Sequence, residues 1–115
     1  MTLKKEDRIY PIPRERRSSI DAIVIAHCLD FERRGEELLR RTLPRRVLME
    51  YRYLNARILS AASEVVGSDA ELYVREIGSQ TGYAKSAAEG VSEAVYKSRK
   101  REVKRKIAQK LNLIE

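Results

Sequence analysis

The sequence predicts an all-α protein, with an N-terminal antiparallel helical hairpin, a helix-turn-helix-like region and a long basic C-terminal helix. Three observations lead to this class. Isoleucine, leucine and valine recur at steps of three and four residues, which is the period of an amphipathic helix. Residues 47–65 carry a heptad-like apolar seam. Charged residues make up 36% of the chain, above the usual quarter or so, which suits a thin helical assembly with much surface.

The length of 115 residues fits one domain. We expect an extended basic arm over residues 1–17 and a single helical domain over residues 18–115, divided into the hairpin (18–67) and the helix-turn-helix-like region (68–115). In the arm, two prolines at positions 11 and 13 favour extended backbone. The basic residues that follow either enter a DNA minor groove, as flexible basic arms do, or belong to a solubilising tail. They are Arg14, Arg16 and Arg17.

The first helix of the hairpin is expected over residues 19–41. One of two adjacent serines, at positions 18 and 19, serves as its N-cap, and Asp21 complements the dipole of the first turn. Gly35 weakens its middle, and Pro44 ends it because the residue before a proline avoids the α region. Its expected apolar stripe comprises Ile20, Ile23, Val24, His27, Phe31 and Leu38.

The second helix is expected over residues 44–66, with Pro44 at its first position. Gly67 follows as the glycine that closes the helix. The seam of this helix comprises Val47, Tyr51, Leu54, Ile58, Ala61 and Val65, and it is satisfied either within the chain or across a dimer. Paired arginines at positions 33–34, 40–41 and 45–46 surround the turn of the hairpin. They form either a second basic patch or ordinary solvated helix faces.

Two further helices are expected in the second half of the chain. Ser68 caps a third, shorter helix, and three glycines between residues 78 and 90 break residues 78–92 into turns and a short helix. Ser92 then begins the last long helix, which reaches about Leu111.

The net charge of +7 is concentrated near the C-terminus. Residues 97–110 contain eight basic residues and one glutamate, whereas residues 61–96 contain two basic residues and six acidic ones. A positive field focused in this way attracts nucleic acid or an acidic protein surface.

Catalytic equipment is not visible. His27 and Cys28 are adjacent, so they point about 100° apart on a helix and cannot act together as base and nucleophile. Zinc sites generally need three or four ligands, more than this pair supplies. The glycines match neither phosphate-binding loop pattern. We therefore expect no enzyme activity, no cofactor and no metal.

The cellular setting is expected to be the cytoplasm. The single cysteine suits a reducing compartment. The charged N-terminus lacks the apolar region of a secretory signal, and no apolar run approaches the roughly 20 residues that span a bilayer.

Two helix-turn-helix registers are available in the second half of the chain. In one, Gly78 is the small residue where two helices pack closely and Gly82 is the turn residue with positive φ. In the other, Gly90 makes the turn and Ser92 starts the recognition helix, but Ser86 and Glu89 then fall where small or apolar residues are expected. The registers exclude each other as single motifs.

Several of these segments resemble pieces of small phage and prophage transcriptional regulators, which are similar to region 4 of bacterial sigma factors. The segments are Glu76-Ile77-Gly78, Gly82-Tyr83, Gly90-Val91-Ser92, Tyr96-Lys97-Ser98-Arg99-Lys100-Arg101 and Ile107-Ala108-Gln109-Lys110-Leu111. The resemblance covers about 45 C-terminal residues and departs from the family in the long spacing between Ile77 and Gly90. It implies a DNA-binding protein of a bacterium or its virus, with RNA polymerase as a further partner.

We therefore expect a phage- or prophage-type DNA-binding transcriptional regulator that uses its basic C-terminal helix on double-stranded DNA. Lysine and arginine reach phosphates, and arginine also reads guanine in the major groove. The expected contact residues are Lys85, Lys97, Arg99, Lys100, Arg101, Lys104 and Arg105, with Arg14, Arg16 and Arg17 of the arm. The alternatives are a protein-interaction module that docks on an acidic partner, a small terminase-like packaging component, and a solvated helix end without a partner. A homodimer would match the two-fold symmetry of DNA half-sites.

Overall fold

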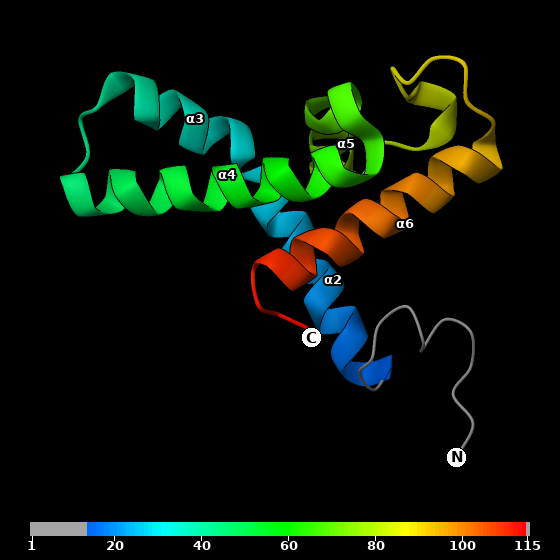
Figure 1. Ribbon diagram of the computed structural model, residues 1–115, viewed down its shortest axis with the longest axis horizontal. Helices are drawn as coiled ribbons and strands as arrows, with labels where there is room; N and C mark the ends of the chain where they lie inside the picture. Colours follow the sequence, from blue (N-terminus) through cyan, green and yellow to red (C-terminus); the bar gives the residue numbers. More distant parts are fainter. Residues whose placement is uncertain (1–13, 115) are drawn as a thin grey trace.

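The structure is a computed structural model that describes residues 14–114, and of residues 14–18 it describes the backbone alone. Every regular element over this range is helical, which confirms the predicted all-α class. Figure 1 shows α4 lying along the longest axis of the molecule, with α6 running obliquely below its C-terminal half and α2 pointing away downward. The elements are α2 (Arg14–Leu29), α3 (Phe31–Arg40), α4 (Arg45–Val66), the 3₁₀ turn η1 (Gly67–Asp69), α5 (Ala70–Gly78), the 3₁₀ turn η2 (Tyr83–Lys85) and α6 (Glu93–Lys110).

The core lies where α2, α5, α6 and the C-terminal half of α4 meet. Each of these helices contributes one apolar stripe, and fully burying a side chain of this size stabilises the fold by about 1.5–3 kcal/mol. In α2 the buried stripe runs through Ile20, Val24 and Cys28 at steps of four. Ile23, which was expected in the core, is 41% exposed, because α5 and α6 cover a narrower face than predicted. The largest fully buried side chains are Tyr73, Tyr96, Ile58, Ile77, Ile107, Val24, Val74 and Val103.

The first predicted helix is two helices, separated at Asp30 and not at Gly35. It also begins at Arg14, so the last residues of the predicted extended arm are helical; charged residues with long unbranched side chains favour helix once the second proline has passed. Residues 1–13, including both prolines of the arm, lie outside the described residues.

Arg34 holds the break between α2 and α3 in place. Its Nη2 donates to the carbonyl of His27 at 2.6 Å, an acceptor in the last turn of α2, and its Nε donates to Oδ1 of Asn55 at 2.7 Å. Asn55 in turn donates to the carbonyl of Phe31 at 3.0 Å. Burial lowers the pKa of Arg34 from its ordinary value. The chain therefore turns at Asp30 because α4 supplies a side chain that binds both Arg34 and the start of α3.

Beyond the contacts of Arg34 and Asn55, α3 and the first half of α4 run side by side in opposite directions and extend away from the core (Figure 1). We call residues 35–57 the α3–α4 projection. None of these residues is buried, and in α4 burial begins at Ile58. The hairpin is thus formed by α3 with α4, whereas α2 belongs to the core. Pro44 precedes α4 as its N-cap residue instead of occupying the first helical position.

The glycines around α5 do three different things. Gly67 has φ +59° and ends α4 as expected, and Gly90 has φ +71°. Gly82 has φ −83° and ψ 169°, so the positive φ expected there is wrong; its backbone is extended. Gly78 is the small residue of a close helix contact, but the contact is with the end of α2, where an added Cβ would lie 2.6 Å from the backbone nitrogen of Leu29.

The connection between α5 and α6 spans residues 79–92 and contains only the turn η2. A helix-turn-helix motif joins its helices by three or four residues as a rule. The long spacing that the sequence showed is therefore a real loop, and neither predicted register gives a compact pair of helices there.

Candidate nucleic-acid interface

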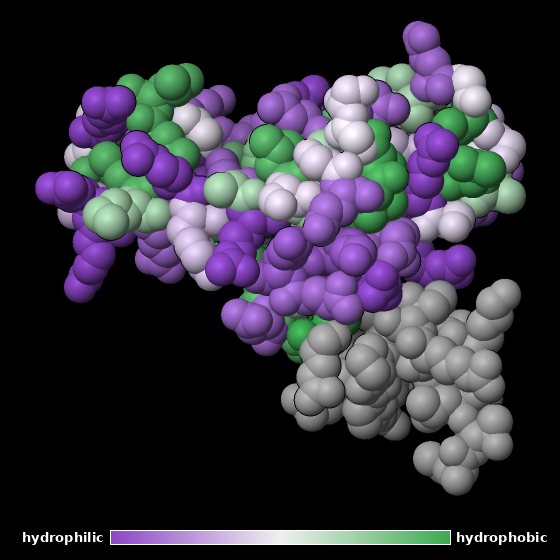
Figure 2. All heavy atoms as spheres, viewed as in Figure 1, coloured by the Kyte–Doolittle hydropathy of each residue, from purple (hydrophilic) through white to green (hydrophobic). Residues whose placement is uncertain are grey.

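Local sequence signals position α6. The hydroxyl of Ser92 accepts a hydrogen bond from the backbone nitrogen of Val95 at 3.2 Å, which makes it the predicted N-cap. Tyr96, Val103 and Ile107 then bury one stripe of the helix against the core. Val95 lies outside this stripe and is 42% exposed. With the stripe fixed, the basic residues are forced onto the flanks and the outer face, and hydrophilic side chains gather over α6 in Figure 2.

Four of the predicted contact residues gather around one solvent-open hollow of about 280 Å³. They come from two successive turns of α6, and Asp21 of α2 completes the lining. Lys97 and Arg101 are exposed, while Lys100 and Lys104 are half-buried. We call this surface the α6 hollow. Its lining residues are Lys97, Lys100, Arg101, Lys104 and Asp21.

Asp21 is the unexpected member of the α6 hollow. Its Oδ1 atom is buried and has no hydrogen-bond partner among the described residues. The sequence predicted this carboxylate as a dipole partner for the first turn of a helix, but α2 begins at Arg14, so Asp21 lies within the helix and lines the cationic surface. One carboxylate among four cations leaves the hollow clearly positive, with a formal charge of +3.

Lys100 is held in the lining by the body of the protein. Its Nζ donates to the carbonyl of Thr81 at 2.7 Å and lies 5.2 Å from the centre of the Tyr96 ring. Burial lowers the pKa of Lys100, and the neighbouring charge of Lys104 lowers it further. Lys100 and Lys104 therefore repel each other, and a polyanion bound between them would reduce this repulsion.

The other predicted residues lie elsewhere. By helical rotation Arg99 falls on the opposite flank of α6 from Lys97 and Lys104. Arg105 pairs with Glu102, with its Nε 3.1 Å from Oε2. Lys85 is exposed in η2 and does not line the α6 hollow. The side chains of Arg14, Arg16 and Arg17 lie outside the described residues. The gathered residues 97, 100, 101 and 104 follow the spacing i, i+3, i+4 and i+7, which places side chains on one side of a helix and is the sequence signal for this set.

Among the described residues, Glu93 competes with an external anion for Lys97. Its Nζ lies 3.0 Å from Oε1 of Glu93, and both side chains are mostly exposed. Exposed pairs of this kind contribute only about 0.2–1 kcal/mol. The pair is therefore easily exchanged for an external anion.

Glu76 anchors the loop that leads into α6, a role that the sequence did not reveal. Its buried carboxylate accepts hydrogen bonds from the Ser86 hydroxyl (2.6 Å), the Ala87 backbone nitrogen (2.7 Å) and the Tyr96 hydroxyl (2.6 Å). Burial raises the pKa of this carboxyl, but the three hydrogen bonds and the charge of Lys100 outweigh it, so the pKa lies below its ordinary value. Burial, and then the hydrogen bond to Glu76, raise the pKa of Tyr96 to about 12. The carboxylate of Glu76 thus ties both the loop and α6 to α5.

His27 and Cys28 of α2 both have shifted pKa values. Burial raises the pKa of Cys28 to about 12, so this thiol stays protonated and unreactive at neutral pH. Burial and the Arg34 charge lower the pKa of His27. Within residues 14–114 no group of three or more histidine, cysteine or carboxylate side chains is placed to hold a metal ion. No helix in this part of the chain combines the length and apolarity needed to cross a membrane.

A second cationic surface appears on the α3–α4 projection, away from α6. It gathers arginines that the sequence placed near the hairpin turn, together with Arg52, which was not singled out.

The chain matches no protein-family model, no curated protein and no solved structure.

Proposed function

We propose that this protein binds double-stranded DNA through the α6 hollow, as a regulator of the phage or prophage type that its C-terminal segments resemble. The observation that supports the proposal is the gathering of four cations on one flank of a rigidly held helix. A helix presenting a row of lysine and arginine side chains can follow phosphates along a groove edge. Three of the four are lysines, which suits contacts to phosphate more than the bidentate reading of bases.

The salt dependence of binding gives the first test. If all four cations neutralise a phosphate, log affinity should fall against log salt with a slope of about −3 to −4. A labelled 20-base-pair duplex, titrated by fluorescence anisotropy at several sodium chloride concentrations, measures this slope. No binding at the lowest salt would end the proposal.

A matched pair of variants tests the assigned surface. Lys97→Gln with Lys104→Gln removes two charges from the α6 hollow, and the slope should become less steep by about 2. Arg99→Gln with Lys106→Gln removes two charges from the opposite flank of the same helix, and the slope should stay the same. Equal losses in the two variants would show that overall charge, and not the α6 hollow, determines binding.

Asp21 provides a test of opposite sign. Its carboxylate repels an incoming phosphate, so Asp21→Asn should strengthen DNA binding several-fold at low salt. The matched control is Asp69→Asn, which removes the same charge in the exposed turn η1. An unchanged affinity in Asp21→Asn would place the DNA away from the α6 hollow.

A further inference from the structure

The α3–α4 projection leaves apolar and cationic side chains exposed together. Leu39 is 86% exposed, Met49 59% and Tyr53 50%. Helices in proteins gain most of their stability by packing an amphipathic face, yet no residue of 35–57 is buried. Apolar residues show among hydrophilic ones over α3 and the adjoining end of α4 in Figure 2. Within the part of the chain that the structure describes, this region therefore has a face without a partner.

One stripe of α4 carries this face. Residues 45, 49, 52, 53, 56 and 60 lie within about a third of a turn of one another on the helix, and all six are exposed. The stripe lies opposite the apolar seam, which points toward α3 and the core. It is about 22 Å long at 1.5 Å per residue.

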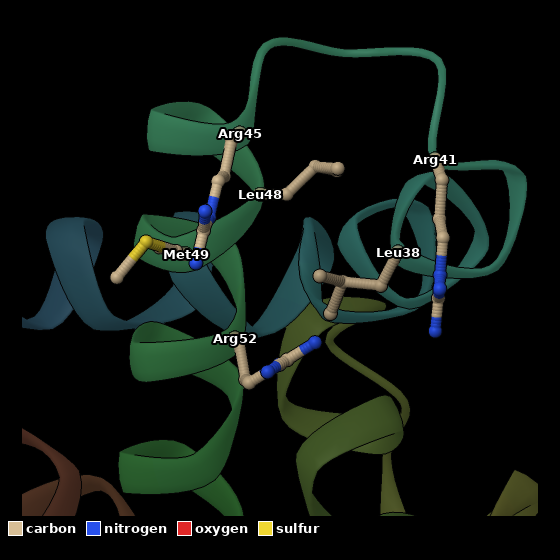
Figure 3. Close-up of a pocket in the computed structure, with 6 residues that line it drawn as sticks. All are labelled: Leu38, Arg41, Arg45, Leu48, Met49 and Arg52. Atoms are coloured by element: carbon tan, nitrogen blue, oxygen red, sulfur yellow. The ribbon is translucent and has the colours of Figure 1, made fainter.

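Two hollows lie along the stripe. The first, of about 320 Å³, is drawn in Figure 3: Leu38 and Leu48 reach toward each other from α3 and α4, and three arginines surround them. The second, of about 300 Å³, includes Tyr53, with Arg57 stacked 4.6 Å from its ring centre. We call the two hollows together the α4 groove. Its lining comprises Leu38, Arg41, Arg45, Leu48, Met49 and Arg52 in the first hollow, and Tyr53, Ala56, Arg57, Ser60 and Lys110 in the second.

The charges of the α4 groove select its occupant. Five of the lining residues are cationic and none is acidic. A second copy of the chain would bring like charges together if it docked by the same surface. The α4 groove also differs in composition from the lysine-rich α6 hollow, since it contains tyrosine, methionine and several arginines. These residue types are enriched in protein–protein interfaces. Charge complementarity therefore points to an acidic protein segment.

The spacing of the hollows indicates the form of that segment. Their α4 residues are centred about eight positions apart, or about 12 Å along the helix. Side chains at i and i+7 or i+8 of a partner helix are separated by a similar distance, and such anchors are how an amphipathic helix binds a groove. Each hollow is at the lower limit of the roughly 300–1,000 Å³ of small-molecule sites, which suits one or two side chains.

We propose that the α4 groove binds an acidic amphipathic helix of a partner protein. Apolar side chains about two turns apart would enter the two hollows, and carboxylates beside them would pair with Arg41, Arg45 and Arg52. This interaction uses a surface separate from the α6 hollow, so it holds whether or not the chain binds DNA.

A selection from displayed random 16-residue peptides on the full chain tests the proposal. The enriched peptides should be acidic and should carry apolar residues at i, i+3 or i+4, and i+7. A labelled copy of the most enriched peptide should bind at least tenfold more weakly to Met49→Ser with Tyr53→Ser. Both side chains are mostly exposed, so this variant should keep the wild-type circular dichroism spectrum and melting curve.

A charge-matched pair completes the design. Arg45→Gln with Arg52→Gln should weaken peptide binding several-fold, and Lys97→Gln with Lys104→Gln should change it less than twofold. Enrichment no greater than on bare beads, non-acidic winners, or a peptide indifferent to the groove variants would overturn the proposal. Three other results would also overturn it: self-association in sedimentation, binding to duplex DNA, or binding to phosphatidylglycerol vesicles. Each would count if the groove variants abolish it and the Lys97/Lys104 variant does not.

Discussion

The contact at Gly78 allows a stability prediction with an internal control. A Cβ on this residue would lie 2.6 Å from the backbone nitrogen of Leu29 and 2.7 Å from the carbonyl carbon of Cys28. Ordinary contacts begin near 3.4 Å, so α2 and α5 would have to separate by most of an ångström. The atoms that it meets belong to the backbone and cannot rotate away.

The expected cost follows from two opposing effects. Overpacking of this kind costs about 1–3 kcal/mol, and replacing a helical glycine by alanine returns at most about 1 kcal/mol. Because the clash involves two helices of the core, we expect the upper part of the overpacking range and a net loss of about 1–2 kcal/mol for Gly78→Ala.

Gly35 is the matched control, since it lies inside α3 with nothing within 4 Å of an added Cβ. Gly35→Ala should raise the free energy of unfolding by about 0.5–1 kcal/mol. Urea denaturation followed by circular dichroism measures both variants against the wild type. A Gly78→Ala protein as stable as Gly35→Ala would refute the close approach of α2 and α5.

Three further predictions concern buried polar groups. Because the folded pKa of Glu76 lies below its unfolded value of about 4.3, its contribution to stability is present above that pH and is lost as the pH falls through the folded pKa. Glu76→Gln should therefore be less stable than the wild type at pH 7 by about 1–3 kcal/mol. Below pH 4.3 its urea midpoint should fall less on acidification than that of the wild type. An equal fall in both proteins would contradict this reading. Arg34→Met leaves the carbonyl that Arg34 binds and Oδ1 of Asn55 without a donor, so it should cost about 1–3 kcal/mol per unsatisfied group. Arg33→Met on the exposed neighbour should leave the urea midpoint nearly unchanged. Cys28, with a pKa of about 12, should react with a disulfide reagent at pH 8 only at the rate of unfolding, and rapid labelling of the native protein would show that the thiol is accessible.

The elements that the sequence predicted well are those with local signals. The bounds of α4 followed from Pro44 and Gly67, and the start of α6 followed from the Ser92 cap. These signals act within a turn of the residue that carries them, so a single sequence is enough to read them. The division between core and projection was harder to predict, because a helical pattern shows which face is apolar but not which part of that face packs against another element.

The features that the sequence did not predict depend on distant partners. The break at Asp30 requires Asn55, which lies 21 positions beyond Arg34. The need for a small residue at Gly78 was recognised, but its neighbour was assigned to the next helix instead of to α2. The candidate site was predicted in part, because the sequence identified the basic helix. Which of its cations lie on the same flank can be worked out only when the buried stripe of the helix is known.

The absence of burial over residues 35–57 has a consequence for the dynamics of the chain. Amide hydrogens in the core helices can exchange with solvent only when the whole fold opens, whereas those of α3 and the first half of α4 are protected by helical hydrogen bonds that a local opening breaks. Among the helices, deuterium should therefore enter this region first, and uptake should slow abruptly at Ile58. A ligand seated on the α4 groove would then register as delayed exchange in the fast region alone.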